Sequence, residues 1–98
     1  MYMLWVRLLA PAAQSAPLLD KRPIYNGFRL AIDPEDSIEH IHVKIGSGVV
    51  DVTFFHVIDS PVVAAGVVQA ICSKVIDTSA HLENWMIFLS DPRAQAGQ

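Results

Sequence analysis

Two histidines and an aspartate within a short stretch of this 98-residue chain are the residues best suited to chemistry. His40 and His42 are two residues apart, so on a β-strand both imidazoles would lie on one face. Asp51 follows across a Gly-Ser-Gly turn, and imidazole with carboxylate is a ligand combination that zinc and iron accept. A His-x-His pair is also ordinary polar surface on many hairpins. We therefore expect no cofactor, and a metal site at His40 and His42 is the less favoured interpretation.

His56 is expected on the opposite face of its strand, because it shares the parity of the apolar residues Val52 and Phe54. A hydrogen-bonded histidine in the core or at an interface explains that position most simply. The alternative is a small-molecule pocket between helix and sheet. The candidate ligand-binding residues of such a pocket are His56, Tyr25, Trp85 and Asp51.

The remaining reactive residues favour structural roles. Cys72 lies among valines and isoleucines, which predicts a buried thiol rather than a nucleophile. Trp5 and Trp85 suit a pocket, a core or an interface anchor. The acidic residues between Asp33 and Glu39 surround a proline and indicate a capped turn. The chain has no phosphate-binding loop, dinucleotide fingerprint, nucleophile elbow or His-Glu-x-x-His motif, so a non-enzymatic role is favoured.

A β-hairpin must position the two histidines. Apolar and polar residues alternate on both sides of Gly46-Ser47-Gly48, which predicts strands near residues 40–45 and 49–57. Two registers with a two-residue turn keep apolar residues opposite apolar ones. One places His42 opposite Asp51, and the other places Lys44 opposite Asp51.

Three further strands are predicted. Residues 2–9 alternate with Arg7 as their only charge, which indicates a strand covered on most of both faces. Asn26-Gly27 is a strong turn signal and predicts a strand at residues 28–32. Residues 85–89 fit a buried strand, although a helix behind Ser79 is the alternative.

One long helix is predicted at about residues 61–76. Asp59 or Ser60 would cap it, with Pro61 in the first turn. It is apolar around most of its circumference, which is typical of a helix buried on two sides. One side would pack on the sheet, and the other could meet a partner chain.

The predicted strands and helix together indicate one α+β domain spanning residues 1–98, with the helix packed on one face of a mainly antiparallel sheet. A two-helix arrangement would need another helix within residues 12–22 or 34–40. Hydrophobic residues make up 52% of the chain and charged residues 17%, an apolar surplus that favours a homodimer. The helix at 61–76 or a sheet edge would form its interface.

The net charge of −3 and the scattered basic residues argue against a nucleic-acid partner. No uninterrupted apolar run suits a membrane span, so we expect a cytoplasmic protein with no membrane partner. The predicted function is a non-enzymatic binding or accessory protein that acts as a homo-oligomer. A small-molecule-binding domain or simple enzyme with a pocket near His56 is the alternative.

Overall fold

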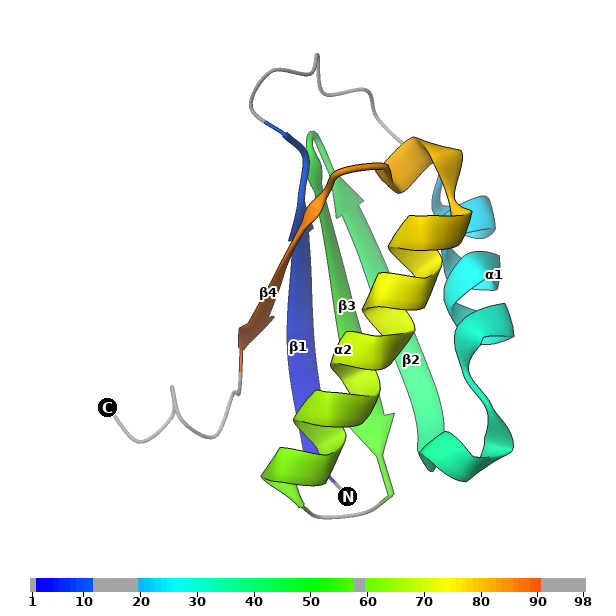
Figure 1. Cartoon of the computed structure of the whole chain (residues 1–98), viewed down its shortest axis with the longest axis vertical. Coiled ribbons are helices and arrows are strands. Elements are labelled where there is room, and N and C mark those ends of the chain that lie inside the picture. Colours follow the sequence, from blue (N-terminus) through cyan, green and yellow to red (C-terminus); the bar gives the residue numbers. More distant parts are fainter. Residues whose placement is uncertain (1, 12–19, 58–59, 91–98) are drawn as a thin grey trace.

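Four strands form one antiparallel sheet, and two helices lie together on one of its faces (Figure 1). The computed structural model describes residues 2–11, 20–57 and 60–90. Its elements are β1 (Tyr2–Leu9), α1 (Lys21–Ala31), β2 (Ile38–Gly46), β3 (Val49–His56), α2 (Pro61–Thr78) and β4 (Met86–Ser90), with 3-10 turns at Pro34–Asp36 and Ala80–Leu82. The strand order is β2-β3-β1-β4, the split β-α-β arrangement of ferredoxin-like domains. The predicted α+β class with a mainly antiparallel sheet is confirmed.

The predicted hairpin is β2 and β3. Gly46 pairs with Val49 and Lys44 with Asp51, so the second of the two predicted registers is the one adopted. Gly48 has a φ of 70°, which glycine adopts without strain. A Cβ atom on Gly46 would lie 2.9 Å from Cγ1 of Val49, so the valine side chain occupies the space that a side chain at position 46 would need.

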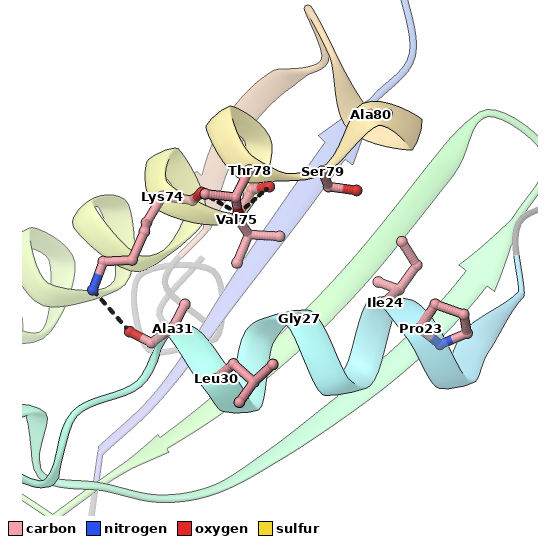
Figure 2. Close-up of a pocket in the computed structure, with 10 residues that line it drawn as sticks. All are labelled: Pro23, Ile24, Gly27, Leu30, Ala31, Lys74, Val75, Thr78, Ser79 and Ala80. Carbon is pink, nitrogen blue, oxygen red and sulfur yellow. Dashed lines mark hydrogen bonds between the residues drawn. The ribbon is translucent and has the colours of Figure 1, made fainter.

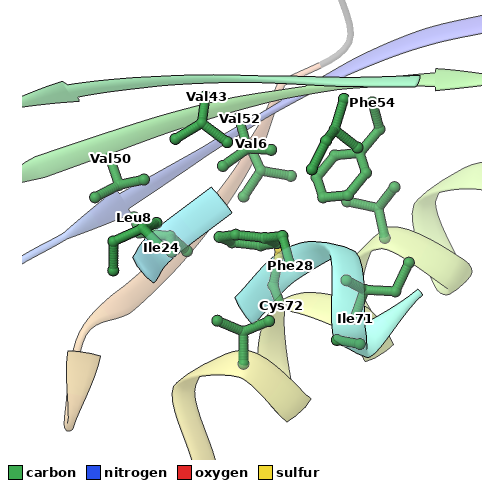
Figure 3. Close-up of a cluster of buried hydrophobic side chains, with 14 of the residues drawn as sticks. Val6, Leu8, Ile24, Phe28, Val43, Val50, Val52, Phe54, Ile71 and Cys72 are labelled. Atoms are coloured by element: carbon green, nitrogen blue, oxygen red, sulfur yellow. The ribbon is translucent and has the colours of Figure 1, made fainter. Parts of the chain in front are cut away.

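The core lies between the helices and the facing side of the sheet. The burial of β3 alternates along its whole length, so every second side chain points to the helices. Figure 3 shows these sheet residues facing Ile24, Phe28, Ile71 and Cys72 of the helices. The rings of Phe28 and Phe54 meet edge to face, with centroids 5.9 Å apart and planes at 68°.

The prediction of a turn at Asn26-Gly27 and a strand at residues 28–32 is wrong. Both fall on α1, apart from Ile32, its C-cap. Ile24, Phe28 and Ala31 are spaced for one helix face, and all three are buried. Burial of this face outweighs the local turn preference of Asn-Gly. The helix ends before Asp33-Pro34, because the residue before a proline disfavours helical geometry.

The predicted apolar helix is α2, which continues two residues beyond the expected end. Ser60 is its N-cap, with Oγ accepting a hydrogen bond from the Val63 amide over 3.4 Å. Asp59 lies outside the described residues. The buried residues of α2 form one face of the helix: Ala64, Val68, Ile71, Cys72 and Val75.

By length and composition, α2 is long and apolar enough to cross a membrane, with a mean hydropathy of 1.3 over 18 residues. Core helices of globular proteins meet the same criterion, and one face of α2 packs on the sheet.

The strand interpretation of the last segment is confirmed by β4, which begins at Met86. Trp85 immediately precedes it and is buried in the core. The exposed Asn84 has a φ of 66°, a left-handed conformation that asparagine tolerates better than most residues.

Candidate functional site

The face of the sheet turned away from the helices carries most of the chemically active side chains. On β1, Leu4, Val6 and Leu8 are buried under the helices, whereas Trp5 and Arg7 between them are exposed. The same alternation places Asp51 and Thr53 of β3 on this uncovered face. The alternation along each strand thus separates these polar residues from the core and places them on the uncovered face.

Two neighbouring rows of residues cross the uncovered face. In the first row, strand pairing places Lys44, Asp51, Arg7 and Phe88 side by side, in that order, across β2, β3, β1 and β4. In the second row, His42, Thr53 and Trp5 are neighbours across β2, β3 and β1. Directly opposed residues on one face have Cβ atoms about 5 Å apart, so adjacent members of each row are within contact distance.

Arg7 and Asp51 form a two-pronged ion pair at the centre of the first row. Nε of Arg7 donates to Oδ1 of Asp51 over 2.8 Å, and Nη2 donates to Oδ2 over 3.1 Å. The hydrogen bond and the charge of Asp51 raise the pKa of Arg7 further. The guanidinium is thus permanently charged and held in one orientation.

A hollow of about 600 Å³ lies over these two rows. Aromatic side chains from β1 and β4 and polar side chains from β1, β2 and β3 line it. The lining residues are Trp5, Val6, Arg7, His42, Lys44, Asp51, Val52, Thr53 and Phe88. Apolar surface beside fixed polar groups is the composition of small-molecule sites.

His40 and His42 both lie on the uncovered face and are exposed, as their spacing predicted. The His40 ring packs against Phe55, with centroids 5.4 Å apart, whereas His42 lines the hollow. Within residues 2–11, 20–57 and 60–90, no three His, Cys, Asp or Glu side chains are grouped to hold a metal ion. The metal site at His40 and His42 therefore stays a prediction.

The four predicted ligand-binding residues are dispersed. His56 is fully buried on the helix side of β3, and Asp51 lies on the other side of the sheet. Trp85 is part of the core, and the half-buried Tyr25 of α1 packs against the core cluster. Of these four residues, Asp51 lines the hollow on the uncovered face, and the other three do not.

His56 has no hydrogen-bond partner for Nδ1 or Nε2 among the described residues, although both atoms are buried. The expected hydrogen bond of a core histidine is therefore missing from this part of the chain.

Arg7, Lys44, Thr53 and Phe88 line the hollow but were not among the predicted site residues. Arg7 carries a signal that sequence can supply, because it is the one charge in an otherwise apolar strand. Its neighbours depend on the pairing of β1 with β3 and β4, which no local pattern in the sequence specifies.

A second hollow, of about 570 Å³, lies between α1 and the end of α2 (Figure 2). Leu30, Ile24 and Val75 give it apolar walls. Nζ of Lys74 donates to the carbonyl of Ala31 over 3.2 Å, and Oγ1 of Thr78 donates to the carbonyl of Lys74 over 2.8 Å. The first bond ties α2 to α1 and the second lies within α2, so both polar side chains are already engaged by backbone carbonyls.

Comparison with known proteins identifies no relative: no family model matches the chain, and no curated protein or solved structure matches it significantly.

Proposed function

We propose that this protein is a non-enzymatic binding protein that acts as a homodimer, joined along the outer edge of β4. The observation that carries the proposal is the difference between the two edges of the sheet. An edge strand presents unpaired N–H and C=O groups, and proteins usually protect such an edge with charges or irregular geometry.

The β4 edge lacks this protection. Its sequence, Met-Ile-Phe-Leu-Ser, contains no charge and no proline. Met86, Phe88 and Leu89 are 58%, 45% and 37% exposed. An apolar, uncharged edge strand is a template for pairing with another chain.

The opposite edge, β2, has the usual protection. Glu39 and Lys44 place charges along it, and the pairing with β3 is irregular between Ile38 and His40. Such irregularities twist an edge away from further strands. The contrast supports β4 rather than β2 as the edge that pairs.

A second copy of β4 fits this edge by symmetry. In an antiparallel two-fold pair centred on Phe88, Phe88 opposes its own copy and Ile87 opposes Leu89. Opposed residues then point to the same face of the sheet, so the uncovered faces of both copies are continuous. The pairing would satisfy the unpaired backbone groups of β4 and place Phe88 beside its own copy, while the uncovered face of each sheet stays open.

The α2 surface is the competing dimer interface. Val62 is 83% exposed and Val63 46% exposed. The rest of the outward face is broken by exposed polar residues: Gln69, Ser73, Lys74 and Asp77. The apolar surface is thus confined to the start of the helix, and we favour β4.

Sedimentation velocity on the full chain tests the proposal. We expect a species of twice 10.8 kDa at roughly 0.1 mM protein. Leu89→Lys, which adds an edge charge, should give the monomer, while the matched variant Val62→Lys should remain dimeric.

A monomeric wild-type protein at that concentration would contradict the dimer. Dissociation by Val62→Lys but not by Leu89→Lys would assign the interface to α2. Both changes are made at exposed positions, so we expect both variants to fold. Circular dichroism of each variant would establish this.

A further inference from the structure

We infer that the hollow on the uncovered face of the sheet binds a small aromatic anion. Trp5 and Phe88 would contact its ring, while Arg7 and Lys44 would bind its negative group. This inference goes beyond dimerisation, because the lining residues come from one chain and the ligand would lie on the face of the sheet, whereas the proposed dimer forms along the outer edge of β4.

The charge of the hollow supports an anion. Arg7 and Lys44 contribute two positive charges, whereas Asp51 is the only carboxylate among the strand-paired residues of this face. Asp51 is engaged by Arg7, and Lys44 has no ion pair within the described residues. The hollow is thus locally positive in a chain whose net charge is −3, an arrangement that attracts an anion to this position.

Arg7 keeps donors free for a ligand. A guanidinium has five N–H groups, and the bonds to Asp51 use one on Nε and one on Nη2. The side chain of Arg7 remains 59% exposed, so its other N–H groups reach solvent. Because Asp51 already fixes its orientation, binding costs Arg7 little side-chain entropy.

The aromatic residues define the other half of the ligand. Trp5 on β1 is 43% exposed and Phe88 on β4 is 45% exposed, unusually open positions for such large apolar rings. Trp5 is the residue two before Arg7, which pairs with Phe88, so the two aromatics are diagonal neighbours. A planar ring placed against them would lie beside the guanidinium, within reach of a charged substituent.

Lys44 and His42 close the far side of the hollow on β2. Together with Thr53 of β3, these two residues provide hydrogen-bond donors on the side of the hollow away from Phe88. The arrangement therefore has aromatic rings on β1 and β4 and donors on Arg7 of β1 and on β2 and β3, which matches a molecule with one aromatic and one anionic end.

NMR titration of the ¹⁵N-labelled full chain tests the inference. We expect 2-naphthoate to shift the Trp5 indole N–H and the Arg7 Nε–H saturably, and the neutral 2-naphthamide to bind about tenfold more weakly. Arg7→Gln should weaken naphthoate binding about tenfold, and Trp5→Leu by a similar factor. Arg29→Gln, which removes an exposed arginine on α1, should leave affinity unchanged.

Equal affinity for naphthoate and naphthamide, or no saturable shift at either probe resonance, would overturn the inference. Adenosine 5′-monophosphate carries a phosphate on a different aromatic ring system and extends the comparison to a second kind of anion. A single-stranded oligonucleotide that binds much more tightly than this monomer would instead make the face a nucleic-acid surface.

The same titration on Leu89→Lys separates this inference from the proposed dimer. Leu89 lies at the edge and does not line the hollow. Undiminished naphthoate binding by this variant is the expected result, whether or not the wild-type chain is dimeric. Loss of binding in a folded Leu89→Lys monomer would contradict a site contained in one chain.

Discussion

Arg7 and Asp51 lie directly opposite each other on β1 and β3 and share two hydrogen bonds, 2.8 and 3.1 Å long. Arg7 is the only charged residue of β1. A slip of one residue between these strands would turn Arg7 into the core and expose the leucines and valine that now pack there. The strand register that forms this ion pair is thus the same register that buries the apolar residues of β1.

Arg7→Leu should leave the fold and the urea unfolding midpoint nearly unchanged. The pair is exposed to solvent, and the core residues of β1 already specify the register. Val6→Ala, at the adjacent buried position, should cost about 2 kcal/mol of unfolding free energy. A larger loss from Arg7→Leu than from Val6→Ala would show that the ion pair supports the fold, and would weaken its assignment to binding.

Phe28→Ala should destabilise the protein by about 3–5 kcal/mol, because it removes a fully buried ring that packs against Phe54. Leu30→Ala on the same helix should change stability by less than about 0.5 kcal/mol, since Leu30 is 87% exposed. Urea denaturation of the two variants measures both values. Similar losses at the two positions would contradict the helical face assigned to α1.

The hairpin could be predicted from sequence because three local constraints agree. Strict alternation, a Gly-Ser-Gly turn and the matching of apolar residues across the strands leave only two registers. The adopted register places Lys44, rather than His42, opposite Asp51. Opposite charges across a strand pair are favourable, so the choice has a physical reason.

The first helix could not be predicted in the same way, because its local and tertiary signals conflict. Asn26-Gly27 favours a turn, whereas the spacing of Ile24, Phe28 and Ala31 favours a helix that buries one face. The second signal has its effect only when α2 and the sheet are present to cover that face. Tertiary packing decides the outcome.

The candidate site was predictable only in part. The facing of His42 and Asp51 follows from alternation along one hairpin. Arg7 and Asp51 are 44 residues apart in sequence, and Phe88 is brought beside Arg7 by the pairing of the first and last strands. These neighbours are products of topology, which single-strand patterns do not encode.

His56→Leu should be neutral or stabilising, within about 1 kcal/mol of the wild-type protein. The imidazole is fully buried, and neither nitrogen has a hydrogen-bond partner among the described residues, so leucine removes two unsatisfied polar atoms at little cost in volume. Thermal and urea unfolding provide the measurement. A loss above about 2 kcal/mol would mean that the imidazole makes a favourable polar contact.

The stability of the protein should fall as pH rises above 9, through Cys72. Burial raises the pKa of this thiol from 9.0 to about 12, so the unfolded chain loses its proton first. Unfolding is then favoured by about 1.4 kcal/mol for each pH unit between these two values, and the effect is absent below pH 9. Urea midpoints across this range measure it, and Cys72→Val, which cannot ionise, corrects for other titrating groups. Identical pH slopes for the two proteins would show that the thiolate is tolerated in the core.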